Sequence, residues 1–528
     1  MNNKKLNIWL PLLFSVTIIL GMFIGYKMKE SMPGRKFFST EKRNALQEIT
    51  DLINSRYVDK VDTKALTDTA ILAILSKLDP HSVYIPSKEL LQINDEIKGS
   101  FFGIGIQFNM IDDSLNIIQI VENGPAEKAG LQIGDIILKA DDSVVSGIKI
   151  SADKIRTFLR GNYDSKTNLS ILRNGKTLLK EVKRGSIPIP SLDAYYMLTD
   201  TVGYIKLNKF SSTTYKEFMN ALLTLKKKNM KSLVLDLRGN GGGVLDEATE
   251  IVDELLAGDK LITYTEGLHH PKKEYRCRRE GQFETGKVVV LADEGSASAS
   301  EVVMGALQDW DRATIVGRRS FGKGLVQEQY DLSDFSALRL TVARYYTPIG
   351  RSIQRSYKNG SKSYYADVSN RLTDGEMVTA DSVKNDTTKL YKSQAGKKLY
   401  GGGGISPDFF VAADTGRIGF ISAKIYGKGT LDNFGYNYYK LHQQALSAYK
   451  NPTQFVSSFK LSATDWQYFE TLANKDSIIT KSIDVIEKKV LEKIIKSSIA
   501  RQLFKSEGFV EVTNENDNCI KRAMEVLR

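Results

Sequence analysis

A serine within a run of small residues is the first candidate for chemistry. The run at 295–301, Gly-Ser-Ala-Ser-Ala-Ser-Glu, follows an apolar, β-rich segment at 287–292 and precedes a helical pattern at 302–307. A hydroxyl at such a junction lies beside the N–H groups of a helix N-terminus, which can bind developing negative charge. Ser298 is therefore a candidate nucleophile. Ser and Ala clusters also serve as helix caps and in tight packing, so the run alone leaves both interpretations open.

A lysine between two glycines is the second candidate. Lys323 lies in the stretch 318–327, Arg-Arg-Ser-Phe-Gly-Lys-Gly-Leu-Val-Gln. Glycines at 322 and 324 allow the backbone to turn sharply and the lysine to point inward, although most lysines are solvated. Lysine titrates near ~10.4 in water, so it can act as a base only where burial lowers its pKa. The chemistry therefore requires a protein wall that excludes water around Lys323.

These stretches together resemble the carboxy-terminal processing (tail-specific) proteases. Residues 236–243, Asp-Leu-Arg-Gly-Asn-Gly-Gly-Gly, resemble that family's Asp-Leu-Arg-x-Asn-x-Gly-Gly signature, and the motifs occur in the family's order from about residue 40 to 410. Three further segments resemble the family: 78–84, 347–354 and 401–408. The resemblance implies a serine peptidase with a catalytic Ser298–Lys323 dyad and with Gln327 orienting the lysine. His81, in the segment 78–84, is expected to have a structural role.

The glycine-rich loop at 239–243 follows an apolar segment, 233–237, that reads as a buried strand. Sites in α/β proteins usually form at the carboxyl ends of strands. We therefore expect the backbone of Gly242 and Gly243, with the N–H of Ala299, to form an oxyanion hole. The alternative is a flexible turn. Asp236 and Arg238 are expected to hold the loop rather than to react.

A segment of about eighty residues, beginning at Phe101, resembles a PDZ domain. It contains Gly-Pro-Ala-Glu-Lys-Ala-Gly-Leu at 124–131 and closes with a hairpin signal, Asn174-Gly175. Four residues match the carboxylate-binding loop of PDZ domains: Gly103, Ile104, Gly105 and Ile106. Such a loop binds a peptide C-terminus, and the peptide then adds a strand to the sheet. The expected partners are proteins or peptides with free C-termini; a β-domain that binds nothing is the alternative.

An uncharged apolar run from Ile8 to Tyr26 follows Lys4 and Lys5. Its length suits a transmembrane helix and is long for the core of a signal peptide. We expect an uncleaved, single-pass anchor in the cytoplasmic membrane, with the catalytic domain outside the cytoplasm on the periplasmic side. This orientation rests partly on the export of the resembled family. A cleaved signal peptide is the alternative.

The composition is that of a globular protein of several domains, because 528 residues exceed one hydrophobic core. The net charge of +12 is spread along the chain and accompanied by 62 acidic residues, which favours solubility over nucleic-acid binding. Four scattered histidines and two distant cysteines, Cys277 and Cys519, give no metal-ligand spacing. We expect no metal and no cofactor, and the sequence leaves open whether the cysteines pair.

The predicted fold class is mixed α/β and multidomain. An anchor and linker at 1–34 precede a helical segment at 35–97, a PDZ β-domain at 98–185, an α/β peptidase core at 186–415 and a helical region at 416–528. Between Lys358 and Lys398 we expect a long polar surface insertion. The last region has no chemistry of its own; it can brace the core, form a dimer or contact a partner such as an adaptor protein.

Two other function classes compete with the peptidase. Residues 317–323 fit the Gly-x4-Gly-Lys start of a phosphate-binding loop, which would make the chain a nucleotide-binding protein. That motif requires Ser or Thr next and then a helix, whereas Gly324 and an alternating, strand-like pattern follow. The third possibility is a non-catalytic PDZ scaffold, against which the intact Ser298, Lys323 and Gln327 argue.

Overall fold

The computed structural model describes residues 4–31, 44–382, 387–414, 420–480 and 483–528. The chain divides into two compact units, Met1–Ile71 and Leu72–Arg528, each of which is described by itself. The domain boundaries predicted at residues 34 and 415 lie outside the described residues.

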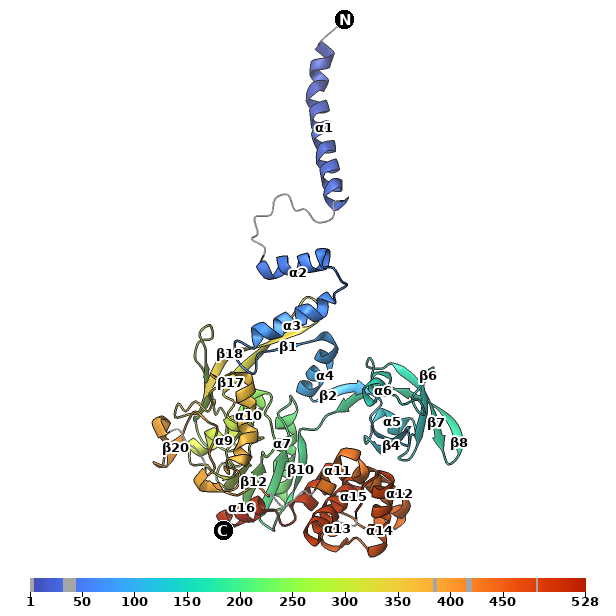
Figure 1. Cartoon of the computed structure of the whole chain (residues 1–528). Helices are drawn as coiled ribbons and strands as arrows, with labels where there is room; N and C mark the ends of the chain where they lie inside the picture. Colours follow the sequence, from blue (N-terminus) through green and yellow to red (C-terminus); the bar gives the residue numbers. More distant parts are fainter. Residues whose placement is uncertain (1–3, 32–43, 383–386, 415–419, 481–482) are drawn as a thin grey trace. The chain divides into compact units, whose positions relative to one another are not determined.

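The first unit is helical. Helix α1 (Lys4–Ser31) contains a span, Trp9–Lys27, that is long and apolar enough to cross a membrane. A membrane anchor and a signal sequence both have this length and composition. Helix α2 (Ala45–Arg56) is capped by the Asn44 side chain, and α3 (Thr63–Leu75) crosses the division into the second unit (Figure 1).

A six-stranded sheet forms the centre of the second unit, in the order β10-β11-β12-β15-β16-β21. All neighbours are parallel except β10 and β11. The strands are β10 (Leu192–Met197), β11 (Val202–Leu207), β12 (Ser232–Asp236), β15 (Lys287–Ala292), β16 (Ala313–Gly317) and β21 (Phe409–Phe410). The central strands β12 and β15 are buried on both faces, which explains their unbroken apolar sequences.

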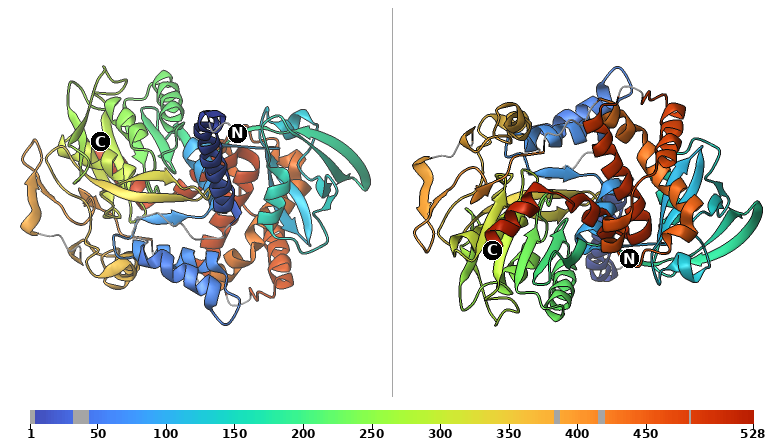
Figure 2. Two further views of the ribbon diagram at one scale, coloured as in Figure 1. Left: turned by 90° about the horizontal axis from the view of Figure 1, so that it is seen from above. Right: turned by 90° about the horizontal axis from the view of Figure 1, so that it is seen from below.

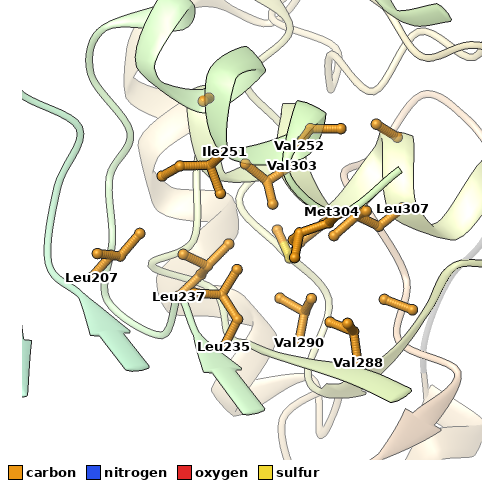
Figure 3. Packing of buried hydrophobic residues seen from close by; sticks show 14 of the residues in the cluster. Leu207, Leu235, Leu237, Ile251, Val252, Val288, Val290, Val303, Met304 and Leu307 are labelled. Atoms are coloured by element: carbon orange, nitrogen blue, oxygen red, sulfur yellow. The ribbon is translucent and has the colours of Figure 1, made fainter. Parts of the chain in front are cut away.

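Helices pack on both faces of this sheet. On one face lie α7 (Thr214–Lys227), α8 (Leu245–Asp253) and α9 (Ala299–Asp309). Figure 3 shows Leu235 and Val290 of the strands pointing toward Val252 of α8 and Met304 of α9. On the other face, α16 (Asn518–Leu527) packs on β15 and β16, and α15 (Val485–Asn514) reaches β10. In the right view of Figure 2 the red C-terminal helix lies against this core.

A second, antiparallel sheet carries the segment after Lys323. Its order is β1-β18-β13-β14, with β17 paired to β18. The strands are β1 (Val83–Ile85), β13 (Leu261–Glu266), β14 (Lys273–Arg276), β17 (Leu325–Asp331) and β18 (Ala337–Tyr346). The paired strands predicted after Lys323 are therefore confirmed. Because β17 is a strand and not a helix, the phosphate-binding loop is excluded.

The predicted polar insertion between Lys358 and Lys398 is only partly a surface segment. It forms α10 (Gly360–Thr373), η1 (Ala380–Ser382), η2 (Thr387–Lys389) and β19 (Leu390–Lys392), which pairs with β20 (Lys398–Tyr400). Tyr364 and Arg371 of α10 are buried. The prediction was wrong for α10, because a helix with a mainly polar sequence can bury two long side chains that find polar partners.

The predicted PDZ segment is a separate β-domain. Its sheet has the order β3-β4-β5-β7-β8, with β6 paired to β5. The elements are β3 (Ile106–Ile111), β4 (Ser114–Ile120), α5 (Pro125–Lys128), β5 (Ile136–Ala140), β6 (Ser143–Val144), α6 (Ala152–Leu159), β7 (Lys166–Arg173) and β8 (Lys176–Lys183). Helix α4 (Ser87–Lys98) and the ribbon of β2 (Ser100–Gly103) with β9 (Gly185–Pro188) connect this domain to the rest. The mixed α/β, multidomain fold is thus confirmed.

The C-terminal region is a helical bundle with its own apolar core. It comprises α11 (Phe420–Lys428), α12 (Thr430–Leu446), α13 (Pro452–Ser458), α14 (Ala463–Lys475) and the first part of α15. Helix α15 is interrupted at Phe504 and Lys505, which have non-helical backbone angles. After this break the helix packs against the six-stranded sheet, where Val510 shares an apolar cluster with Val289 and Leu291. Cys519 of α16 and Cys277 are both buried and free.

The last helix should contribute directly to the stability of the core. Ile520 is 8% exposed and belongs to one apolar cluster with Val289 and Leu291 of β15. Ile520→Ala should lower the free energy of unfolding by about 2–5 kcal/mol, because it removes buried methyl groups and leaves a cavity. Denaturant unfolding would measure this. Lys521→Ala, one position along at an exposed site, should change little; equal effects of the two substitutions would show that α16 is not part of the core.

Candidate active site

Ser298 occupies a strained turn between β15 and α9. Its backbone has φ +55° and ψ −115°, a conformation that residues other than glycine rarely adopt. Such strain costs about 1–3 kcal/mol and is kept where the surroundings impose it. Ser298 is the residue that precedes α9, so its side chain lies beside the first N–H groups of that helix, which have no partner inside it.

The parallel pairing of β12 with β15 brings the glycine-rich loop to this turn. Both strands end at the same edge of the sheet, and each continues into one of the two loops. Asn240, which is fully buried, connects the loops: its carbonyl accepts bonds from the Ala297 N–H and the Ser300 hydroxyl, both at 2.9 Å. Its side-chain amide donates to the Leu207 carbonyl (3.1 Å). The loop is therefore a fixed wall beside Ser298.

Gly242 and Gly243 have positive φ, at +94° and +145°. A Cβ on Gly242 would lie 2.6 Å from the Ala297 carbonyl oxygen, and one on Gly243 would lie 1.9 Å from that of Phe210, so both positions require glycine. The Gly242 N–H already donates to Asn240 Oδ1 (2.9 Å). The Gly242 carbonyl accepts from the Phe210 N–H, and the Val244 N–H donates to the Phe210 carbonyl. The Gly243 N–H takes no part in these two bonds. Of the three predicted oxyanion donors, the Gly242 N–H already donates to Asn240, whereas the N–H groups of Gly243 and Ala299 can still donate to an oxyanion.

Asp236 and Arg238 hold the base of this loop. Asp236 is fully buried and accepts from the Arg238 side chain (2.7 Å) and from the Tyr204 hydroxyl (2.7 Å). Burial alone would raise its pKa, but Arg238 and Lys206 hold the pKa of Asp236 well below its usual range. Arg238 also pairs with Asp517, at the start of α16 (2.8 Å). The C-terminal segment is thereby connected to the glycine-rich loop.

Lys323 lies just before β17 and lines the same cavity as Ser298 and Gln327. The cavity has a volume of about 440 Å³, and Gly242, Gly243 and Ala299 also line it. Burial, with a contribution from the nearby Arg339 guanidinium, lowers the pKa of Lys323 to about 8, against opposing effects of Glu301 and Asp79. Over the described ranges, no acid forms an ion pair with the Lys323 ammonium. A fraction of this lysine is therefore neutral near pH 8.

Glu301 joins the Ser298 turn to the Lys323 loop. Its fully buried carboxylate accepts four hydrogen bonds. Oε2 accepts from the N–H of Ser298 (2.9 Å) and of Lys323 (2.8 Å), and Oε1 accepts from the Gly322 N–H (2.8 Å) and the Ser320 hydroxyl (2.5 Å). Burial raises the pKa of Glu301, and these bonds oppose that rise. Glu301 was not among the site residues predicted from the sequence, although Ser298 and Glu301 have the Ser-x-x-Glu spacing of a capping box.

Gln327 is held by a chain of polar groups that ends in the segment 78–84. Its amide Nε2 donates to Thr341 Oγ1 (3.4 Å), and that hydroxyl donates to Asp79 Oδ1 (3.1 Å). Ser82 completes the network, because its hydroxyl donates to Asp79 Oδ2 (2.6 Å) and accepts from the Thr341 N–H (3.1 Å). Gln327 thereby acquires a fixed orientation in the cavity. Pairing of β1 with β18 brings these residues together, which the sequence alone did not indicate.

His81 is not a base for Ser298. Its Nε2 pairs with the Tyr364 hydroxyl (2.9 Å), and its ring contacts the rings of Phe321, Tyr364 and Tyr365. Burial, with a contribution from Lys323, lowers the pKa of His81 to about 4. It is therefore a neutral packing residue behind the Lys323 loop, in agreement with the structural role expected for it.

Helix α10 supports the Lys323 loop from the same side. The Arg371 guanidinium donates to the carbonyls of Arg319 (3.2 Å), Ser320 (2.8 Å) and Phe321 (3.2 Å). The Ser320 hydroxyl also accepts from the Ile405 N–H (2.7 Å), which connects the glycine-rich segment 401–408 to the loop. The backbone before Lys323 is therefore fixed on two sides.

The predicted carboxylate-binding loop connects β2 to β3 in the β-domain. Ile104 is buried, and Gly105 has φ +79°. The Ile104 carbonyl accepts from Ala126 (2.8 Å) and the Gly105 carbonyl from Val121 (2.9 Å), which fixes the loop. Strand β3, which starts at Ile106, lies at the edge of its sheet. An edge strand beside such a loop can accept a further strand.

No cluster of three His, Cys, Asp or Glu side chains able to hold a metal occurs among the residues that the structure describes.

Family models match four segments of the chain. Peptidase family S41 matches residues 201–362, and the PDZ domain matches 103–183. The N-terminal domain of the activating protease CtpB matches 26–89, and a family of unknown function matches 422–505.

A carboxy-terminal-processing protease of Bartonella bacilliformis is 33% identical over 349 residues, which cover 64% of this chain and 80% of that protein. The chain belongs to the carboxy-terminal processing protease family. It is a serine peptidase with a PDZ domain. The carboxy-terminal processing protease CtpB of Bacillus subtilis is also 33% identical, over 63% of this chain and 72% of that protein. Among solved structures, the photosystem II D1 C-terminal processing protease is 26% identical over 70% of this chain and 87% of its own, with a TM-score of 0.35.

Glu301 should position the active site of this peptidase without contacting the substrate. In Glu301→Gln an amide NH2 replaces one carboxylate oxygen, so at least one N–H donor loses its acceptor. We expect kcat to fall roughly 10- to 100-fold, because a displacement of about 1 Å at reacting groups has effects of this size, with little change in KM. Steady-state kinetics would measure both constants. Glu328→Gln, at an exposed position of β17, should retain activity; unchanged kcat in Glu301→Gln would refute the positioning role.

Proposed function

We propose that this peptidase hydrolyses peptide bonds through a Ser298–Lys323 dyad. The observation that carries the proposal is the shared cavity, in which Ser298 lies with a lysine whose pKa is lowered to about 8 and with Gln327. Neutral Lys323 takes the Ser298 proton as the hydroxyl oxygen attacks the scissile carbonyl carbon. The ammonium then gives that proton to the leaving amine, and an acyl-enzyme remains on Ser298. Water, activated by the same lysine, hydrolyses this ester.

The N–H groups of Gly243 and Ala299 bind the negative charge that develops on the carbonyl oxygen. Gln327 orients the base: because Thr341 occupies its amide N–H, the amide oxygen is left to accept a bond from Lys323. An uncharged acceptor suits this task, because a carboxylate there would stabilise the ammonium and raise the pKa of the base.

The substrates that we propose are proteins or peptides with free C-termini, bound at Gly103, Ile104, Gly105 and Ile106. Support comes from the match to the PDZ family and from the edge position of β3. The terminal carboxylate would bind the loop, and the tail would add a strand to β3.

We further propose that α1 remains as a membrane anchor, with the catalytic unit outside the cytoplasm. The uninterrupted length of the apolar span, Trp9–Lys27, supports this assignment.

The activities of single and double variants should show that Ser298 and Lys323 act together. Ser298→Ala and Lys323→Ala should each abolish peptide cleavage, and the double variant should be hardly worse, because residues that act as one unit are not additive. Lys323→Arg should also be inactive, since a guanidinium stays protonated. Peptide hydrolysis and trapping of an acyl adduct on Ser298, detected by mass spectrometry, would measure this. Full activity of Ser298→Ala would refute the proposal.

Amidation of the substrate C-terminus should weaken recognition. The amide lacks the charge that the loop at 103–106 would bind, so affinity for Ser298→Ala protein should fall by about tenfold, in line with loss of a charge-assisted hydrogen bond. Fluorescence anisotropy with matched free-acid and amidated peptides would measure the difference. Equal binding of the two forms would count against tail recognition.

The anchor assignment predicts that the intact chain stays with the membrane fraction. In spheroplasts, added protease should digest the catalytic unit from outside the cytoplasm. Edman or mass-spectrometric analysis of the N-terminus should find the apolar span present. Recovery of a soluble form that begins near residue 27 would show a cleaved signal instead.

A further inference from the structure

Arg339 is a charged residue of the catalytic cavity that the proposed mechanism does not use. It lies on β18, is partly buried and lines the cavity together with Ser298 and Lys323. Its Nη2 donates to Gln329 Oε1 (3.1 Å). Within the described part of the chain, no carboxylate forms an ion pair with it.

Other arginines around the catalytic loops have acidic partners. Arg319 pairs with Glu376 (2.6 Å), Arg351 with Asp309 (2.5 Å) and Arg355 with Asp367 (2.6 Å). A guanidinium offers five N–H donors in a fork that matches a carboxylate. Because the bond to Gln329 uses only one donor, most of the hydrogen-bonding capacity of Arg339 remains for a group that enters the cavity.

The position of Arg339 identifies which part of a substrate it meets. Arg339 and Tyr345 of β18 both line the cavity together with Lys323 and Gln327. Gln327 pairs with Thr341 across β17 and β18, and the Tyr345 hydroxyl donates to the Lys323 carbonyl, so Arg339 lies on the Lys323 side of Ser298. The general acid protonates the leaving amine. The residues that follow the scissile bond must therefore pass Lys323.

We propose that Arg339 binds a carboxylate of the substrate on the C-terminal side of the scissile bond, so that the peptidase favours an acidic group there. The proposal rests on the dyad mechanism proposed above. The carboxylate can come from an Asp or Glu side chain or from the free C-terminus of a short tail, and both present the same two oxygens.

A purely electrostatic role for Arg339 makes a different prediction. If the guanidinium only lowered the pKa of Lys323, its removal would slow cleavage of all substrates by the same factor. Binding of a carboxylate instead makes the loss depend on the substrate. The ratio of rates for an acid and its amide, measured within one variant, therefore separates the two roles.

The test uses peptide pairs that carry Glu or Gln at one of the first four positions after the scissile bond, with identical C-terminal tails. Wild-type enzyme should show a higher kcat/KM for Glu by about tenfold at one position, the size expected of a charge-assisted hydrogen bond. In Arg339→Gln the ratio should fall to within about twofold, and Arg339→Lys should retain part of it. Arg344→Gln, at an exposed position of β18 that does not line the cavity, should keep the wild-type ratio.

A second arm distinguishes the source of the carboxylate. Gln-containing peptides of decreasing length are compared as free acids and amides. A preference for the free acid that persists in Arg339→Gln belongs to the PDZ domain. One that disappears in Arg339→Gln shows that the terminal carboxylate reaches Arg339, and this result also supports the proposal.

Binding measurements keep the test decisive if Arg339→Gln is inactive. In Ser298→Ala and Ser298→Ala/Arg339→Gln, the Glu peptide should lose about tenfold in affinity with the second substitution, and the Gln peptide should lose little. The proposal would be overturned if wild type preferred neither a Glu side chain nor a free C-terminus, or if a preference for the Glu side chain survived in Arg339→Gln. Cleavage of the neutral peptides, lost in Ser298→Ala, would leave the dyad intact in that case.

Discussion

The buried carboxylate of Glu301 is the interaction on which the active site depends. Ser298 follows a strand of the parallel sheet, whereas Lys323 precedes a strand of the antiparallel sheet. Glu301 accepts the backbone N–H groups of both residues on one oxygen. Burial of an ionised carboxylate costs several kcal/mol, and four hydrogen bonds of about 1.5–3 kcal/mol each offset that cost. The mutual placement of Ser298 and Lys323 is therefore set by the backbone.

In this arrangement, different groups meet the two requirements that a lysine base would have. The lysine side chain must be poorly solvated, and its loop must be rigid. Glu301 supplies rigidity through the backbone N–H of Lys323, and it forms no ion pair with the side chain. Arg371, from the buried side of α10, fixes three carbonyls of the same loop. Burial can therefore lower the pKa of Lys323 while the loop stays in place.

The sequence predicted those elements of the structure that depend on short, continuous stretches of the chain. The apolar segments at 233–237 and 287–292 indicated buried strands, and the glycine-rich loop was placed correctly at a strand end. The family resemblance selected Ser298, Lys323 and Gln327. Contacts between distant segments carried no such signal. Asp79 reaches Thr341, the partner of Gln327, only because β1 pairs with β18, and Arg371 reaches the loop only because a polar helix folds back onto it.

The C-terminal region shows the same limit of sequence reasoning. Its helical pattern was clear, but the pattern could not tell which helix belongs to the bundle and which to the core. The structure assigns α11 to α14 to a separate apolar cluster, whereas α16 covers the second face of the parallel sheet. Asp517, just before α16, pairs with Arg238 below the glycine-rich loop. The end of the chain therefore supports the glycine-rich loop of the core, although the predicted domain boundary near residue 416 assigned it to a separate region.

The pH dependence of Ser298 acylation is the most direct test of Lys323 as the base. An active-site acylating probe reacts at a rate proportional to the neutral fraction of Lys323, so the labelling rate should rise with pH with a midpoint near 8. In the proposed mechanism the deprotonated lysine is the base, and its pKa is lowered from 10.5, so the labelling rate rises as the pH increases. Arg339→Gln should move the midpoint upward, since it removes a like charge. A labelling rate independent of pH between 6 and 10, or a midpoint unchanged in Lys323→Ala, would contradict the account.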